Sequence, residues 1–309
     1  MELSILLIKQ IIGLFLIVVL GFVIVKMKVL STFDSKTIST LVLYVVAPCT
    51  IINAFQIEFT KDTFNGLMLS FLAAGIVHII FFVITPIFDK MFHFMNIEKA
   101  TVMYSNSGNL VIPLVSAVLG PKWVLYCSGY MIIQTILLWT HCKALVCEEN
   151  DFSFKKILLN INVISIFIGI LLFVFKIQLP SMIATPVTNI GNMIGPLSML
   201  VIGMVLANIN FKNVFASKRT YLICFLRLVV YPLIVIGVFK LCNIQSLHPE
   251  GFKILLITVL AASAPAGSTV TQFAQLYDKH PGYASAMNVL SVIFCIITMP
   301  LMIMLYQML

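Results

Sequence analysis

The sequence YSNSGNLVIP, residues 104–113, interrupts a run of apolar residues that is otherwise long enough to cross a bilayer. A second stretch, AASAPAG at residues 261–267, interrupts a similar run in the second half of the chain. Glycine and proline break helices and leave backbone N–H and C=O groups unpaired, and hydrocarbon offers them no partner. Such breaks survive at membrane depth only where they line a cavity inside the protein. Two of them, one in each half, are typical of a transport site.

The composition places the chain in the membrane. Of 309 residues, 61% are hydrophobic and 10% are charged, whereas a soluble domain carries roughly 25% charged residues. The mean hydropathy is +1.10. Because one span needs about 20 residues, the chain has room for roughly ten spans with short loops and for no separate soluble domain.

The apolar runs predict ten helices. The first is expected to be a retained span, because no basic region precedes it and no small-residue cleavage site follows it. The predicted helices cover residues 3–25, 36–54, 64–88, 98–119, 122–143, 155–175, 184–207, 219–242, 252–276 and 282–306.

The distribution of Lys and Arg predicts the orientation. If the N-terminus faces outward, twelve of these residues fall in inward loops, six fall on the outward side and Arg227 lies within a span. This bias predicts a multi-pass protein of the cell membrane with both termini on the extracytoplasmic side. The formal net charge of +8 then reflects topology and attraction to anionic lipid of the bilayer. We expect no nucleic-acid partner.

Prolines in the two halves suggest an internal repeat. Aligning Pro113 with Pro265 gives an offset of 152 residues, and aligning Pro48 with Pro196 gives 148. Because five spans are an odd number, the second unit is expected to be inverted relative to the first. The alternative is coincidence, since prolines are frequent in membrane helices. The predicted division is a first five-helix repeat at residues 1–143, a short cytoplasmic linker at 144–154 and an inverted second repeat at 155–309.

The residues around both breaks are polar and neutral. A half-helix that begins at such a break presents unpaired N–H groups and a partial positive charge, which suit an anion. Pro113 is expected in the first turn of the second half-helix, where its missing donor costs nothing. The alternative is that these side chains merely satisfy the freed backbone. The candidate substrate-binding residues at the breaks are Asn106, Ser107, Gly108, Asn109, Pro113, Ser263, Pro265, Gly267, Ser268, Thr269 and Gln272.

The charged and titratable residues leave the coupling ion open. All eleven acidic residues fall in loops or at predicted helix ends, which disfavours a proton antiporter built on buried carboxylates. Sodium can be held by backbone and amide oxygens, so coupling to Na⁺ stays open. His78 is a candidate for H⁺ coupling, against the alternative of a packed, hydrogen-bonded histidine. Arg227 either attracts a substrate carboxylate or latches two parts of the protein, although a carbonyl-bonded or snorkelling arginine is the favoured interpretation.

No motif predicts a metal, a cofactor or an enzyme. The seven cysteines lie mostly inside predicted spans, where they behave as small apolar residues. No nucleophile, base and orienting partner are found together near the predicted midplane, so catalysis is not expected.

Several stretches of the chain resemble, in order, the signature stretches of the auxin efflux carrier family. They are GFVIVKMKVLSTFDSKTISTLVL at residues 21–43, YVVAPCTIINAF at 44–55, NSGNLVIPL at 106–114, GPLSMLVIGMVL at 195–206 and ASAPAGSTVTQFAQLY at 262–277. The resemblance implies ten transmembrane helices in two inverted five-helix repeats, with broken helices 4 and 9 that cross. It also implies a relation to the bile-acid/sodium symporter fold. Helices 1, 2, 6 and 7 would form a scaffold, and helices 3–5 and 8–10 a transport unit.

The same resemblance suggests a function. It implies secondary active or facilitative transport of small organic anions, such as malate- or malonate-like carboxylates, by elevator-type alternating access. It adds Gln134 to the substrate-binding candidates. Val111 and Asn109 depart from the residues that are usual at these positions, which bears on the substrate more than on the fold. A non-transporting receptor or sensor that uses the same cavity, or a passive channel, is the alternative, and a homodimer is an open possibility.

Overall fold

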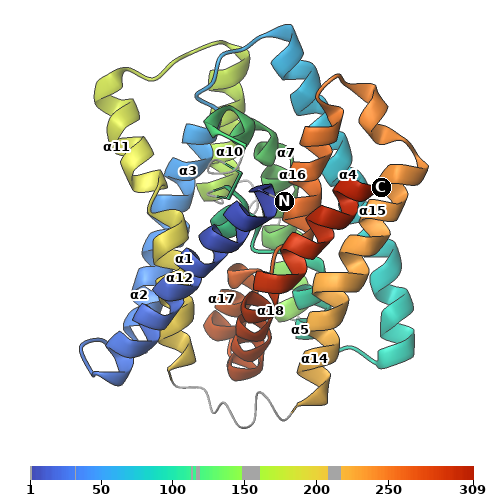
Figure 1. Ribbon diagram of the computed structural model, residues 1–309. Coiled ribbons are helices and arrows are strands. Elements are labelled where there is room, and N and C mark those ends of the chain that lie inside the picture. The colour runs from blue at the N-terminus through green and yellow to red at the C-terminus, as the bar shows by residue number, and fades with distance from the viewer. Residues whose placement is uncertain (1, 32, 113, 116–118, 148–160, 208–216) are drawn as a thin grey trace.

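The fold comes from a computed structural model, which describes residues 2–31, 33–112, 114–115, 119–147, 161–207 and 217–309 (Figure 1). Pro113 and the predicted linker therefore lie outside the described residues. Within those ranges the chain is almost entirely helical, and its only extended pairing is an antiparallel bridge between Ser105 and Ala266. The expected all-α class is confirmed.

The helices of the first half follow the predicted order. Three of the predicted spans, 36–54, 98–119 and 122–143, contain short π-helical or 3-10 turns in place of one regular helix. The elements are α1 (Glu2–Lys26), α2 (Asp34–Leu41), η1 (Val42–Val46), α3 (Ala47–Ala54), α4 (Lys61–Phe92), α5 (Asn96–Met103), η2 (Ser107–Val111), η3 (Pro121–Tyr126), α7 (Cys127–Leu137), η4 (Leu138–Cys142) and α8 (Lys143–Cys147).

The second half is also helical, with a break between α16 and α17. Its elements are α10 (Ile161–Val174), α11 (Ser181–Gly191), α12 (Ile194–Leu206), α14 (Lys218–Phe225), η5 (Leu226–Val230), α15 (Tyr231–Leu241), η6 (Ile244–Leu247), α16 (Gly251–Ser263), α17 (Ser268–Leu276) and α18 (Pro281–Met308).

Five helical segments of the described chain are long and apolar enough to cross a membrane. A sixth is reached if two helices of α18, Pro281–Cys295 and Ile297–Met308, which bend by 53° relative to each other, count as one span. The other predicted spans are shorter or broken within the described residues. The five segments are Asp34–Ala54, Lys61–Phe92, Trp123–Cys147, Ser181–Leu206 and Lys218–Leu241.

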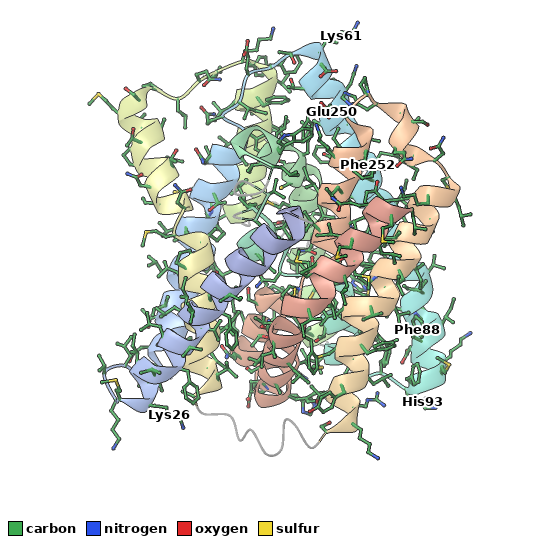
Figure 2. All side chains as sticks on the ribbon, viewed as in Figure 1. Lys26, Lys61, Phe88, His93, Glu250 and Phe252 are labelled. Carbon is green, nitrogen blue, oxygen red and sulfur yellow. The ribbon has the colours of Figure 1, made fainter. Side chains whose placement is uncertain are left out.

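The connections between helices gather at two opposite ends of the molecule. Lys61 and Glu250 lie at one end, whereas Lys26 and His93 lie at the other (Figure 2). Loops at two opposite ends are the arrangement that helices crossing a membrane require.

Buried apolar side chains form one large cluster and two small ones. The large cluster includes Phe81, Tyr231 and Phe273, and draws mostly on α4, α5, α7 and α14–α18. The small clusters centre on α1 with α12 and on η1 with α12. The helices predicted for the transport unit supply most of this cluster, but Ile51 of α3 and Phe173 of α10, from the predicted scaffold, also belong to it.

An ion pair at one end of the molecule ties three of these helices together. Arg219 at the start of α14 donates from Nε and Nη2 to the two carboxylate oxygens of Glu98 in α5, both at 2.7 Å. Tyr283 of α18 donates to the same carboxylate at 2.7 Å. Because the Glu98 side chain is fully buried, these partners compensate its lost hydration.

Helices α1 and α12 pack at backbone contact. A Cβ atom on Gly21 would overlap the backbone oxygen of Leu200, and one on Gly203 would overlap that of Val18. Small residues allow this close approach in membranes, where packing replaces the hydrophobic effect between helices.

We expect Gly203→Ala to lower the free energy of unfolding by about 1–3 kcal/mol, because the added methyl group forces α1 away from α12. Thermal unfolding of the purified protein in detergent measures the change. Gly237→Ala in α15 is the matched control, since a Cβ there has nothing within 4 Å. Equal Tm values for the two variants would contradict this packing.

Candidate functional site

The two broken helices meet at their breaks and share backbone hydrogen bonds. Helix α5 ends at Met103 and α16 ends at Ser263. The N–H of Asn106 donates to the carbonyl of Pro265 at 2.8 Å, and the N–H of Gly267 donates to that of Tyr104 at 2.9 Å. Each break thus supplies partners for the other, which is the internal pairing that unwound backbone requires in an apolar environment.

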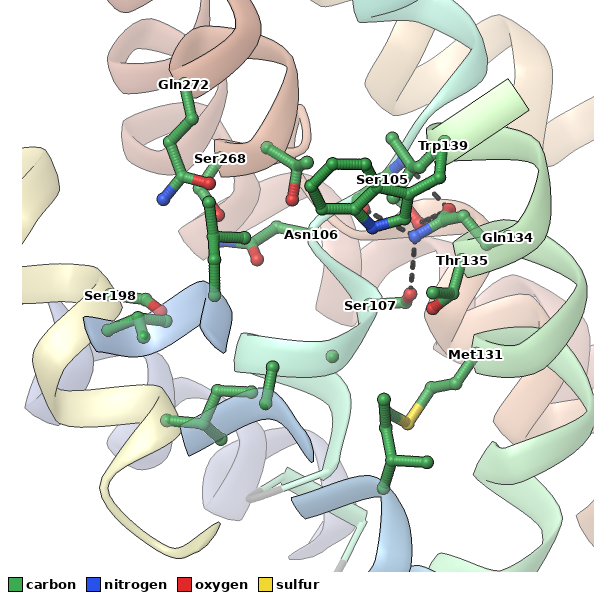
Figure 3. Close-up of a pocket in the computed structure, with 18 residues that line it drawn as sticks. Ser105, Asn106, Ser107, Met131, Gln134, Thr135, Trp139, Ser198, Ser268 and Gln272 are labelled. Atoms are coloured by element: carbon green, nitrogen blue, oxygen red, sulfur yellow. Dashed lines mark hydrogen bonds between the residues drawn. The ribbon is translucent and has the colours of Figure 1, made fainter. Parts of the chain in front are cut away.

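Gln134 of α7 completes the pairing of the first break. Its Oε1 accepts from the backbone N–H of Ser105 at 3.1 Å and from the hydroxyl at 2.8 Å. Its Nε2 donates to the Ser105 carbonyl and to the Ser107 hydroxyl, each at 2.8 Å (Figure 3). The Gln134 amide therefore bonds both the N–H and the C=O of Ser105, as the backbone of a neighbouring β-strand would.

Two residues of α18 support the second break. Asn288 donates from Nδ2 to the carbonyl of Ala266 at 3.0 Å, and the Ala266 N–H donates to the hydroxyl of Ser291 at 3.0 Å. Each break is thus held by an amide side chain from another helix, Gln134 of α7 for the first break and Asn288 of α18 for the second.

Arg227 in η5 bonds to both broken helices at once. Its Nη1 donates to the Val102 carbonyl near the end of α5, and its Nη2 donates to the Ala264 carbonyl after α16, both at 3.1 Å. The side chain is fully buried and stacks over the ring of Phe81 at 5.7 Å. A cation at two helix C-termini opposes their partial negative charge, so the carbonyl-bonded interpretation fits its position.

A cavity of about 90 Å³ lies beside the crossing. Its walls come from η1, α3 and α12 on one side and from the first break, α7, η4 and α17 on the other. Figure 3 shows Ser198 and Gln272 across the cavity from Gln134 and Met131. The volume is several times the roughly 10–15 Å³ that one water molecule needs, so there is room for a small solute.

The polar atoms around this cavity are neutral, and some have no partner. None of the described residues that line it is charged. Within the described chain, Asn106 Nδ2, Ser198 Oγ and Gln272 Oε1 are buried without a hydrogen-bond partner. Ser268 and Thr269, also in the lining, lie in the first turn of α17, the end of the helix that carries partial positive charge. The cavity therefore offers donors and a partial positive charge.

The predicted site residues fall into three groups. Those that line the cavity are Asn106, Ser107, Gly108, Gln134, Ser268, Thr269 and Gln272. Ser263, Pro265 and Gly267 build the crossing behind it. The backbone of Asn109 lies in η2, but its side chain, like the whole of Pro113, is outside the described residues.

Two further candidates lie away from the lining. His78 of α4 bonds through Nδ1 to the carbonyl of Ala74 in its own helix at 2.8 Å and packs against the ring of Tyr130 at 4.9 Å. This matches the alternative of a packed histidine. Arg227 lies at the far side of the crossing, among the helix ends.

The helix that follows the first break begins as η2 at Ser107. The unwound residues between α5 and η2 are those that pair with the second break and with Gln134. Pro113, which was predicted for the first turn of the second half-helix, lies outside the described residues.

Several lining residues carried no sequence signal. Met131, Thr135 and Trp139 line the cavity from the helix that holds Gln134, and Ser198 lines it from α12. Trp139 is packed edge-on against Phe273 of α17, with ring centroids 5.1 Å apart. Met131, Gln134, Thr135 and Leu138 have the spacing of one helix face, so Met131 and Thr135 could have been identified from Gln134.

Several helices that suit a bilayer and a polar cavity at two paired breaks define a multi-pass membrane protein. The family model described as Membrane transport protein matches residues 6–151 and residues 145–303. The chain belongs to this family, which confirms the auxin efflux carrier resemblance, and it is a membrane transporter. No curated protein matches the chain at a significant level. The family consists of transporters, and the described residues contain no group of three or more His, Cys, Asp or Glu that would hold a metal ion.

We expect Gln134→Leu to destabilise the protein strongly. The substitution leaves the N–H and C=O of Ser105 buried without partners, at a cost of about 1–3 kcal/mol for each group. The measurement is Tm in detergent, with Thr135→Val as the control because Thr135 lines the same cavity. A Tm for Gln134→Leu equal to that of the control would show that the break does not depend on the amide.

Arg227→Lys tests the double carbonyl contact at constant charge. A lysine ammonium lacks the planar fork of arginine, so we expect one of the two carbonyls to lose its charged hydrogen bond, worth about 1.5–3 kcal/mol. The loss should appear as a lower Tm, whereas Lys218→Arg at the start of α14 should leave Tm unchanged. Unaltered stability of the lysine variant would argue against the bridging role.

Proposed function

We propose that this transporter is a secondary active or facilitative carrier of small organic anions, with malate- or malonate-like carboxylates as the preferred cargo. The observation that carries the proposal is the cavity beside the crossing, where Asn106 Nδ2 is a buried donor without a partner and α17 begins. A carboxylate is the complement of both features, because it accepts hydrogen bonds and carries negative charge.

The neutral lining favours an anion over a cation as the main cargo. No acidic side chain is present among the described lining residues, and a cation there would face the positive end of α17. An anion needs no full positive charge beside it when helix N-termini and amide donors are directed at it. Transport also requires that binding be reversible, which weak neutral donors permit.

The position of the cavity suits an elevator mechanism. It lies between η1, α3 and α12, which belong to the proposed scaffold, and the first break, α7 and α17, which belong to the proposed transport unit. Cargo held mainly by the second group would move with it, as alternating access requires. In this proposal helices 1, 2, 6 and 7 stay fixed while helices 3–5 and 8–10 move.

The proposed topology has ten spans in two inverted five-helix repeats, with helices 4 and 9 broken and crossing. Both termini would be extracytoplasmic. The support is the excess of Lys and Arg in one set of loops and the separation of the loops to two ends of the molecule (Figure 2). A membrane-impermeant reagent applied to single-cysteine variants at Lys61 and Lys218 distinguishes the sides, because only the first should react from outside.

Asn106→Ala tests the cargo site. Loss of a hydrogen bond to a charged group costs about 1.5–3 kcal/mol, so saturable uptake of labelled malonate into proteoliposomes should fall about tenfold or more at low concentration. Asn192→Ala is the control, because Asn192 is exposed in the turn between α11 and α12 and should transport normally.

The same assay separates the alternatives. Normal uptake by Asn106→Ala would remove the cavity as the cargo site. Stabilisation of the protein by malonate without any flux would indicate a receptor or sensor, and uptake that does not saturate would indicate a channel.

A further inference from the structure

A second, smaller cavity lies on the other side of α17. It has a volume of about 20 Å³ and is enclosed by α12, α17 and α18. This volume slightly exceeds the roughly 10–15 Å³ that one water molecule requires, so the cavity suits one water-sized occupant. Its polar lining residues are Ser268, Thr271, Gln272, Gln275, Ser285 and Asn288.

Three oxygen atoms of this lining are buried and unsatisfied. Ser285 and Asn288 are each 2% exposed. Ser285 Oγ, Asn288 Oδ1 and Gln272 Oε1 have no hydrogen-bond partner within the described residues. Buried polar atoms without partners are uncommon in native proteins and call for an unseen water or ion.

The orientation of the Asn288 amide follows from its other contact. Its Nδ2 lies 3.0 Å from the carbonyl of Ala266, and a carbonyl can only accept, so the nitrogen must be on that side. Oδ1 is therefore the atom left over beside the cavity. The site presents two amide oxygens, from Gln272 and Asn288, and the hydroxyl oxygen of Ser285. Such a set of oxygen ligands suits a hard cation.

We propose that this cavity binds Na⁺ through Gln272, Ser285 and Asn288. Sodium is a hard cation that prefers oxygen ligands, and the site supplies the amide oxygens of Gln272 and Asn288 and the hydroxyl of Ser285. None of the described residues that line the site is a carboxylate, so the charge of the ion is not balanced locally, and the positive end of α17 opposes it. That opposition is confined to the first turn of a helix, whereas Gln272 lies beyond it.

The balancing charge comes from the neighbouring cavity. Ser268 and Gln272 line both cavities, so Na⁺ and an anion would bind on two sides of the same half-helix. This part of the inference rests on the proposed anion cargo. Each ion then lowers the electrostatic cost of the other, and the coupling is reciprocal: sodium tightens anion binding by the factor by which the anion tightens sodium binding.

Thermal unfolding of the purified full chain tests the sodium site directly. NaCl, KCl and choline chloride are compared at equal ionic strength, each with and without malonate. We expect a saturable rise of Tm with NaCl alone, no such rise with KCl or choline chloride, and a lower malonate Kd in NaCl than in choline chloride.

Ser285→Ala is the diagnostic variant, because Ser285 Oγ has no partner whose loss would disturb the fold. It should weaken the sodium response at least about tenfold, as changes around metal sites commonly do. Ser128→Ala is the matched control. Ser128 is also 2% exposed with an unpartnered hydroxyl, but it lines a different small cavity between α3 and α7.

The outcomes separate this inference from the proposed function. Equal stabilisation by the three salts, or an unchanged sodium response in Ser285→Ala, overturns the sodium site and leaves an ordinary buried water as the occupant. A malonate response that is the same in NaCl and choline chloride overturns the coupling while the anion site stands. A sodium response without any malonate response supports the sodium site and overturns the proposed cargo.

Discussion

The polar interior of this protein depends on one constraint: backbone that leaves a helix within an apolar environment must find its hydrogen bonds inside the protein. The chain meets this constraint by placing two breaks together. The N–H of Asn106 and the carbonyl of Pro265 form one pair, and the N–H of Gly267 and the carbonyl of Tyr104 form another. Gln134, Asn288 and Arg227 then bond to backbone groups at and beside the crossing. The buried polar side chains are thus consequences of the unwinding.

The unwinding also places the C-terminal ends of α5 and α16 and the N-terminal end of α17 in different surroundings. The C-terminal carbonyls of α5 and α16 face the guanidinium of Arg227, whereas the first turn of α17 lines the larger cavity. Partial negative charge is therefore compensated by a fixed cation, and partial positive charge is left beside a space that a solute can enter. A single arginine thus compensates the helix C-termini on one side of the crossing, and the positive end of α17 lies at the cavity on the other side with no charged residue among the described lining.

The sequence predicted the features that local chemistry determines. The order of helices and the places of both breaks follow from apolar runs, glycine and proline, and Asn106, Ser107 and Gly108 were identified because they sit in the break itself. The contributions of Ser198, Asn288 and Trp139 depend on which distant helix packs beside the crossing, and nothing in their own neighbourhood shows it.

The paired crossing also affects whether water and protons can pass through the protein. Tyr104, Ala264 and Arg227, directly behind the cavity, are all fully buried, and the backbone between them is occupied by its own hydrogen bonds. Water that entered the larger cavity would find the paired backbone groups of the two breaks already occupied, although Asn106 Nδ2, Ser263 Oγ and Arg227 Nε have no partner within the described residues. The pairing thereby keeps backbone groups out of any file of water at the point where an unwound backbone would otherwise conduct protons.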